Sequence, residues 1–160
     1  MGFDKSIFES FDKDWALVTA GTIDNFNTMT VSWGGLGTLW SLPVATVYVR
    51  QSRYTHEFLD KYDFFTVSFF PDSCRRDLEI LGSKSGRDCD KLAMTSLTPV
   101  ALENAVTFQQ AEQTILCKKI YRQDMDPAAI PQDVIGKYYD GDAIHTIYVG
   151  EVLSVIINSR

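Results

Sequence analysis

Cysteine and histidine are scarce in this sequence, and the few that occur are spread along the chain. The three cysteines, Cys74, Cys89 and Cys117, are odd in number and show no C-x-x-C spacing. This pattern argues against a disulfide framework and is typical of reduced thiols in a cytoplasmic protein. The two histidines lie in no cluster of carboxylates or thiols with metal-ligand spacing. We therefore expect a cytoplasmic protein without a metal centre.

Long apolar runs and an excess of positive charge are also missing. No apolar stretch reaches the ~20 residues of a membrane-spanning helix, and we expect no signal peptide. The chain has 15 Lys and Arg against 21 Asp and Glu, a net charge of −6. Because nucleic-acid binding needs a basic face, we expect no nucleic-acid partner. Because no apolar span is present, we expect no membrane partner either.

Motifs for nucleophilic catalysis and for the Rossmann fold are absent as well. The sequence has no G-x-S-x-G, and no G-x-G-x-x-G follows the first expected strand. The glycine-rich segment 34–37 lacks that spacing and no helix is expected after it. Catalysis by a side-chain nucleophile is therefore not indicated.

What is present is enough apolar sequence for a single domain over residues 1–160, with 45% hydrophobic residues. Runs of β-branched and aromatic residues predict strands over 15–20, 28–33, 44–49, 64–70, 113–121 and 145–157, with another candidate after residue 100 and a bulge near Gly150. Short helices are expected over 3–11, 54–62, 73–81 and 132–138, with a turn at 34–37 and a loop at 82–90. Because strands dominate without βαβ alternation, we predict a closed or partly closed antiparallel barrel.

The stretch from Asn27 to Thr55 combines features that suit a ligand. Glycines at 34–37 permit close approach of a ligand to the backbone. The segment 50–55 places Arg50, Ser52, Arg53 and Thr55 where a helix begins, and free N–H groups beside arginines favour phosphate.

Each of these features has a structural alternative. Arg50 and Arg53 are also explained as solvated charges, and Thr30 and Ser32 as strand formers on a solvent face. Aromatic side chains are often core or interface anchors, and this applies to Trp33 and Trp40. By default Lys91 is a surface lysine, His145 a buried structural imidazole, and His56 an exposed helix residue.

Several motifs, in order over roughly residues 12–156, resemble the flavin reductase-like family of FMN-binding split β-barrels. They are Asn27–Trp33, Pro43, Arg50–Thr55, Phe65–Phe70, Ser85–Asp88 with Asp90 and Lys91, and His145–Val152. One position departs from the pattern: the family often has Asp directly before the late His, whereas Ala143 and Ile144 separate Asp142 from His145.

This resemblance implies a mainly β, antiparallel Greek-key split barrel with short peripheral helices. It also implies a homodimer with one FMN per subunit near the interface, its ring along residues 27–33 and its phosphate at residues 50–55. The flavin performs the chemistry, so no catalytic side chain is expected. The implied cofactor-binding residues are Asn27, Met29, Thr30, Ser32, Trp33, Trp40, Arg50, Ser52, Arg53, Thr55, Ser85 and Lys91.

Three functions are compatible with this reading. The first is an FMN-dependent oxidoreductase that accepts hydride from NAD(P)H and reduces a small acceptor or a redox partner protein. The second is an electron carrier like flavoredoxin, with bound FMN and no nicotinamide site. The third is a flavin-binding or structural homodimer without turnover.

Overall fold

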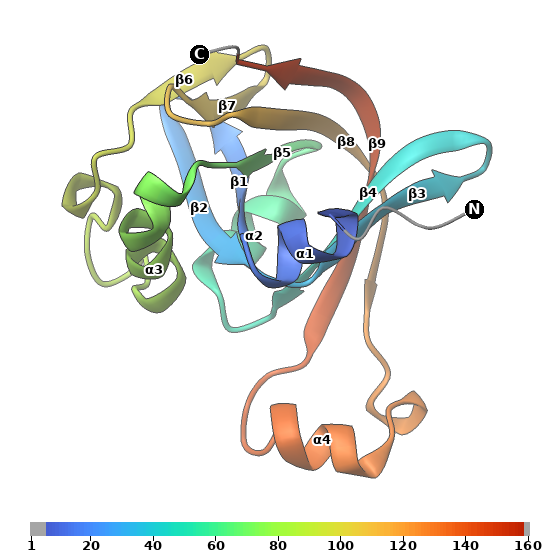
Figure 1. Ribbon diagram of the computed structural model, residues 1–160. Coiled ribbons are helices and arrows are strands. Elements are labelled where there is room, and N and C mark those ends of the chain that lie inside the picture. Colours follow the sequence, from blue (N-terminus) through green and yellow to red (C-terminus); the bar gives the residue numbers. More distant parts are fainter. Residues whose placement is uncertain (1–5, 159–160) are drawn as a thin grey trace.

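A seven-stranded antiparallel sheet organises the computed structural model, which describes residues 6–158 (Figure 1). Its strand order is β2-β1-β5-β8-β9-β4-β3, and β6 and β7 form a separate pair. The strands are β1 Ala16–Thr22, β2 Asn25–Val31, β3 Gly34–Leu39, β4 Leu42–Arg50, β5 Phe64–Phe69, β6 Pro99–Leu102, β7 Ala105–Phe108, β8 Gln113–Asp124 and β9 His145–Ile157. The helices are α1 Ser6–Asp12, α2 Tyr54–Lys61, α3 Arg75–Ser83 and α4 Gln132–Tyr138, with short 3₁₀ turns at Asp72–Cys74, Leu92–Met94 and Pro127–Ala129.

The sheet curls because its two edge strands are consecutive in the chain. β2 lies at one edge and β3 at the other, yet only Ser32 and Trp33 separate them. Those two residues must bring opposite edges of the sheet close together, which produces a partly closed barrel. The expected mainly β antiparallel fold is confirmed.

Two apolar clusters lie on the two faces of the sheet. Inside the barrel, alternate residues of β1, β4 and β5 are buried, including Val18, Val47 and Val67. Leu17 points to the other face of β1, where α3 supplies Leu78 and further apolar side chains. β1 is therefore covered on both faces, and this explains why its residues from Ala16 to Gly21 are all buried.

The glycines at 34–37, expected to form a turn, lie in strand β3. The reversal comes later, where Leu39 pairs with Leu42 around the two-residue loop Trp40–Ser41. Both loop residues have positive φ, 52° and 62°, as in a type I′ hairpin turn. The turn was not predicted because Trp-Ser lacks the Asn-Gly or Asp-Gly signal of such turns.

Gly150 marks close packing in the barrel. A Cβ at this position would lie 2.6 Å from both the Cβ of Cys117 and the ring of Phe65. The expected irregularity is found in the β8–β9 ladder beside it, where the register shifts between Lys119 and Tyr121.

The strand expected to reach Trp33 ends at Val31, because the chain leaves β1 there and crosses to β3.

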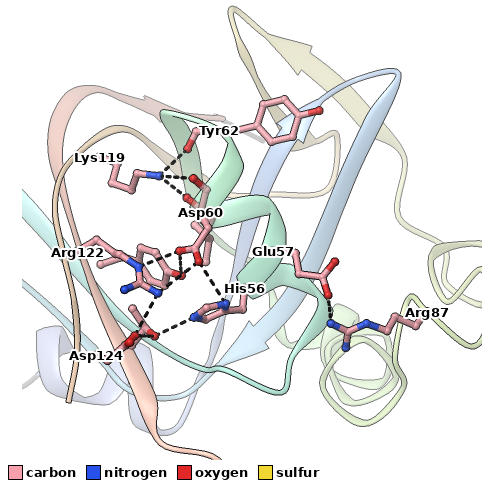
Figure 2. Close-up of polar contacts among 11 residues, drawn as sticks. His56, Glu57, Asp60, Tyr62, Arg87, Lys119, Arg122 and Asp124 are labelled. Atoms are coloured by element: carbon pink, nitrogen blue, oxygen red, sulfur yellow. Dashed lines mark hydrogen bonds and ion pairs between the residues drawn. The ribbon is translucent and has the colours of Figure 1, made fainter. Parts of the chain in front are cut away.

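A polar cluster fixes α2 against β8 and β9 (Figure 2). Asp60 accepts hydrogen bonds from Arg122 and from the Tyr148 hydroxyl, the latter at 2.6 Å. Thr146 donates to Asp124, so the His56 Nε2–H is the donor in the 2.8 Å bond between His56 and Thr146. The prediction that His56 is exposed was wrong: the residue is buried, with 8% of its surface exposed.

The C-terminal end of α2 is held by one lysine. The Lys119 Nζ donates to the carbonyl oxygens of Leu59, Asp60 and Tyr62, which have no partner inside the helix (Figure 2). Held by the Asp60 cluster and by Lys119, α2 presents its N-terminal residues to the edge of the sheet near β2.

None of the helices within residues 6–158 has the length and apolar character needed to cross a membrane.

Candidate functional site

Two cavities follow strand β2, one of the two edge strands of the main sheet. The small cavity, about 190 Å³, lies at its C-terminal end and is lined by Met29, Thr30, Val31, Ser32, Trp33, Tyr48, Arg50, Arg53 and His145. The large cavity, about 580 Å³, lies at its N-terminal end between β2, α2 and the loop 86–92. An edge strand leaves every second residue's N–H and C=O unpaired in the sheet, so β2 offers backbone groups to a ligand.

Eight of the residues predicted to bind the cofactor line these cavities. Met29, Thr30, Ser32, Trp33, Arg50 and Arg53 line the small cavity, and Asn27 and Lys91 line the large cavity. Thr55 lies directly behind them, buried, and its hydroxyl accepts a 2.7 Å bond from the Asn27 amide.

The other predicted residues lie farther from the cavities. Ser52 and Ser85 contact Arg87, since the Ser52 carbonyl accepts from its guanidinium and the Ser85 hydroxyl from its backbone N–H. Trp40 is 65% exposed at the tip of the β3–β4 hairpin, which extends away from the barrel (Figure 1). Within one chain, therefore, Trp40 does not join the site.

Arg53 carries an unsatisfied donor. Its Nη1 donates to the Gly82 carbonyl at 2.9 Å, whereas its buried Nη2 has no hydrogen-bond partner in the described part of the chain. Burial lowers the pKa of Arg53 from its usual value. A buried guanidinium donor without a partner destabilises the protein until an acceptor binds, and an anion is the strongest acceptor.

Lys91 supplies a second positive charge near Arg53. The residue is 4% exposed, and its Nζ donates to the carbonyls of Leu81 and Lys84 at the end of α3. These contacts use two of its three N–H donors. Burial, followed by repulsion from Arg53, lowers the pKa of Lys91 to about 8. Two cations this poorly solvated favour an anionic ligand between β2 and α3.

Arg50, in contrast, is already occupied. Its guanidinium donates to the carbonyls of Ala143 and Tyr138 at 3.1 and 2.8 Å, pairs with Asp142 at 3.3 Å, and lies over the Tyr139 ring. Arg50 thus fastens the segment between α4 and β9 to the barrel. Asp142, which departs from the family spacing relative to the late histidine, is the ionic partner of Arg50.

His145 is buried, as expected, and closes one end of the small cavity. Its Nδ1 bonds with the Tyr139 hydroxyl at 2.6 Å, and its ring lies 5.2 Å from that of Trp33. Burial and the charge of Arg50 lower the pKa of His145 to about 4, so the ring is neutral at pH 7. The imidazole therefore presents a polar but uncharged surface.

Some residues of the site were not predicted from the sequence. Tyr138 packs edge-on against Trp33 at 5.4 Å, and Tyr139 orients His145. These contacts depend on how the α4 segment folds back, so no local pattern reveals them. Gly86 lies within the Ser85–Asp88 motif: a Cβ there would lie 2.4 Å from the Asn27 amide oxygen, so only glycine lets the loop approach β2 this closely.

The three cysteines of residues 6–158 differ in exposure, and none joins a metal-binding cluster. No group of His, Cys, Asp and Glu side chains in that range is arranged to hold a metal ion. Cys117 is buried, and burial raises the pKa of its thiol to about 12. Cys89 is exposed, in the loop that lines the large cavity.

A family model described as "Flavin reductase like domain" matches residues 8–160, nearly the whole chain. The chain belongs to this family. A search of curated protein sequences finds no match to the chain. Solved flavin reductase-like structures share its split-barrel fold at low sequence identity.

Three of these structures illustrate the range of the fold. Flavoredoxin from Methanosarcina acetivorans is 18% identical, with 91% of this chain and 69% of that chain covered and a TM-score of 0.71. An FMN-binding protein from Thermus thermophilus is 21% identical, with 99% and 79% covered and a TM-score of 0.72. An NADH:FAD oxidoreductase from Streptomyces globisporus is 19% identical, with 95% and 80% covered and a TM-score of 0.69.

The residues of this flavin reductase-like domain fit a phosphate-bearing flavin. The buried, unpartnered Arg53 Nη2 and the poorly solvated Lys91 provide the anion-binding end. Gly86 lets the loop 86–92 lie close to Asn27. As an edge strand, β2 offers unpaired backbone groups to the rest of a bound flavin. Flavin binding is characteristic of the family, and the donors at Arg53 and Lys91 are suited to it.

Proposed function

We propose that this protein binds FMN and acts as an oxidoreductase that accepts hydride from NAD(P)H and transfers electrons to a small acceptor or redox protein. One observation carries the proposal: the buried Arg53 Nη2 has no hydrogen-bond partner within residues 6–158 and lies close to the charge of Lys91, with Arg53 lining the small cavity and Lys91 the large cavity beside β2. Bound FMN would supply the hydride and electron chemistry. The chain's own residues bind and orient it.

Two groups of residues beside β2 have distinct roles in this proposal. Arg53 and Lys91 bind the phosphate, and residues 29–33 receive the ring through backbone groups and through Met29 and Trp33. The small cavity is lined by two arginines and no carboxylate, so its potential favours negative charge. The neutral His145, at one end of the small cavity, excludes water there without adding charge.

A flavoredoxin-like electron carrier is the second candidate. It is favoured by the size of the small cavity, since about 190 Å³ is below the ~300 Å³ at which ordinary ligand pockets begin. Tyr138 and His145 also pack on Trp33. Little room is then left for a nicotinamide beside the flavin ring.

We also propose that the protein is a homodimer. Apolar side chains are exposed around α1, β3 and β9, and cavities of about 690 and 410 Å³ open between these elements. The exposed ones there are Ile7, Phe8, Leu36, Leu153, Val155 and Ile157. A two-fold partner would cover this surface, and its own hairpin offers a route by which Trp40 reaches a flavin site.

Anaerobic stopped-flow absorbance separates the two functions. FMN-loaded protein is mixed with NADH or NADPH, and the visible flavin band is followed. Rapid bleaching by one nucleotide is expected for the reductase. Absence of bleaching by both nucleotides, together with reduction by a protein donor, would establish the carrier and contradict the reductase. Protein that takes up no FMN would contradict both.

A further inference from the structure

The connection between β8 and β9 lies apart from the barrel. Residues 125–144, the α4 segment, leave β8, form the 3₁₀ turn Pro127–Ala129 and helix α4, and return to β9 (Figure 1). No residue of α4 is buried, so the helix adds nothing to the apolar core. Because apolar burial is the main driving force of folding, elements with little of it open most readily. The position of the α4 segment therefore depends on a few specific contacts.

Arg50, at the end of β4, fastens the α4 segment to the barrel. Its guanidinium donates to the carbonyls of Tyr138 and Ala143 and pairs with Asp142 at 3.3 Å. The Asp142 side chain is 52% exposed, and an ion pair this open to solvent stabilises little. Arg50 also lines the small cavity, so a ligand in that cavity meets the same side chain that holds the segment.

The α4 segment in turn supports one wall of the small cavity. Trp33 and His145 form this wall, and their rings lie 5.2 Å apart. Tyr138 packs edge-on against Trp33, and the Tyr139 hydroxyl bonds with the His145 Nδ1. Neither tyrosine is among the residues that line the cavity. The α4 segment therefore holds this wall from behind.

The small cavity has little room for a planar ring. Its volume of about 190 Å³ is below the ~300 Å³ at which ordinary ligand pockets begin. Most of its other lining residues belong to strands β2 and β4, which are hydrogen-bonded into the main sheet. The wall of Trp33 and His145 is the side supported by an element without buried residues. Space is gained there at the lowest cost in buried contacts.

We propose that the α4 segment is a gate, held closed by Arg50, that opens for a planar ring to enter the small cavity. This inference rests on the proposed function, which places the flavin ring there. When Arg50 releases the segment, Tyr138 and Tyr139 withdraw their support and Trp33 and His145 move apart. A ligand that binds only the open form has an apparent affinity reduced by the fraction of protein that is open. Any change that opens the gate therefore increases ring binding by the same factor.

Trypsin cleavage after Lys137 measures opening in the absence of a ligand. Lys137 is exposed within α4, and the helix must unwind locally before a protease accepts its backbone. In flavin-free protein, Arg50→Lys should speed this cleavage about tenfold, because lysine keeps the charge but lacks the planar fork that reaches two carbonyls. Cleavage after Lys84, exposed at the end of α3, is the internal reference and should not change.

Two further variants test whether the effect belongs to this anchor. Asp142→Asn removes only the ion pair, at a residue that lines neither cavity, and should speed cleavage after Lys137 by about 2–5-fold. Arg75→Lys is the matched control, because Arg75 also donates to two backbone carbonyls, those of Lys13 and Asp14, outside the α4 segment. It should leave this cleavage unchanged. Equal acceleration by Arg75→Lys would indicate general loosening of the fold and overturn the role of Arg50.

Lumiflavin, the flavin ring without its ribityl phosphate, is the probe for access to the cavity. Stopped-flow fluorescence gives its association rate with flavin-free protein. In Arg50→Lys and Asp142→Asn this rate should rise by the factors by which cleavage rises. Faster cleavage without faster association would show that the segment opens but does not control the cavity, and would overturn the gate. Unchanged cleavage in both variants would show that Arg50 does not hold the segment closed.

Failure of the proposed function gives a different result. Protein that binds neither FMN nor lumiflavin contradicts flavin binding and also removes the access role, even where cleavage after Lys137 responds to Arg50→Lys. FMN binding in the parent, with cleavage and lumiflavin association unchanged in both variants, leaves the proposed function in place and overturns the gate.

Discussion

At the scale of single residues, two neighbouring arginines have different surroundings. Arg53 has a buried donor without a partner within residues 6–158, whereas Arg50 donates to the carbonyls of Tyr138, at the end of α4, and Ala143. The sequence grouped them as one phosphate-binding pair. In the structure, only Arg53 has the free capacity that a phosphate would use.

We predict that Arg53→Ala weakens FMN binding and leaves riboflavin binding nearly unchanged. Hydrogen bonds to charged groups contribute about 1.5–3 kcal/mol, equivalent to a loss of roughly 10–100-fold in affinity. Fluorescence titration with both ligands tests this. Arg50→Ala is the matched control: it should lower the melting temperature of the flavin-free protein, because the 138–143 segment loses its anchor. Equal loss of FMN affinity in both variants would show that Arg50 also binds phosphate.

We predict that FMN affinity declines with rising pH above about 8. Lys91 has a pKa lowered to about 8 in the free protein, so it is charged below that pH and loses its proton above it. A bound phosphate raises this pKa, so binding takes up a proton above pH 8 and weakens by up to about tenfold per pH unit. Dissociation constants between pH 7 and 9 provide the measurement. Lys91→Met should bind FMN more weakly with a flat profile; a profile as steep as the parent's would assign the titration to another group.

At the scale of elements, helix α2 joins the barrel to the candidate site. Its first turn contributes Tyr54 and Thr55, and its other end is fixed by Lys119. The polar cluster around Asp60 holds its middle against β8 and β9. The contacts of Lys119 and Asp60 therefore help to hold Tyr54 and Thr55 in place at the candidate site.

We predict that Lys119→Met lowers the free energy of unfolding by about 1–3 kcal/mol. The change leaves carbonyl oxygens at the end of α2 without their donor while preserving most of the apolar stem. Lys118→Met is the control, because the adjacent Lys118 is exposed. Urea denaturation of both variants gives the values, and equal stabilities for the two would refute this role of Lys119.

Two glycine substitutions should change stability in opposite directions. Gly150→Ala forces a methyl group against Cys117 and Phe65, and overpacking of this kind destabilises by about 1–3 kcal/mol. Gly136→Ala, within α4, meets nothing within 4 Å and should stabilise by about 0.5–1 kcal/mol through helix propensity. Thermal unfolding measures both. Destabilisation by Gly136→Ala would contradict a helix over residues 132–138.

At the scale of the whole molecule, the exposed apolar surface around α1, β3 and β9 predicts a C2 homodimer. Light scattering at micromolar concentration should give twice the 18.1 kDa mass of the chain. Val155→Glu on β9 should shift the protein toward monomer, because a charge would be buried at the interface. Val100→Glu, the same change at an exposed residue of β6 outside this surface, serves as control. A monomeric mass for the FMN-loaded parent would disprove the dimer.

Local sequence patterns predicted most strands and helices, because strand and helix propensities depend on residues that are neighbours in the chain. The strands over 44–49, 64–70 and 145–157 and the helix over 54–62 lie within a few residues of the observed bounds. Patterns failed where a residue's role depends on distant contacts. Gly34 is an example: a Cβ there would meet the Phe11 ring and the Thr46 carbonyl, so glycine serves packing in a strand rather than a turn.

The sequence by itself determined the mainly β barrel, the family, and the segments 27–33 and 50–55 as candidate ligand-binding stretches. Only the tertiary structure distinguished Arg53 from Arg50, buried His56, and set Trp40 apart from the cavities. It also brought Lys91 and Gly86 to β2 from a loop far along the chain. The reason is physical: propensity and periodicity act between near neighbours, whereas burial and hydrogen-bond partners depend on which segments meet in space.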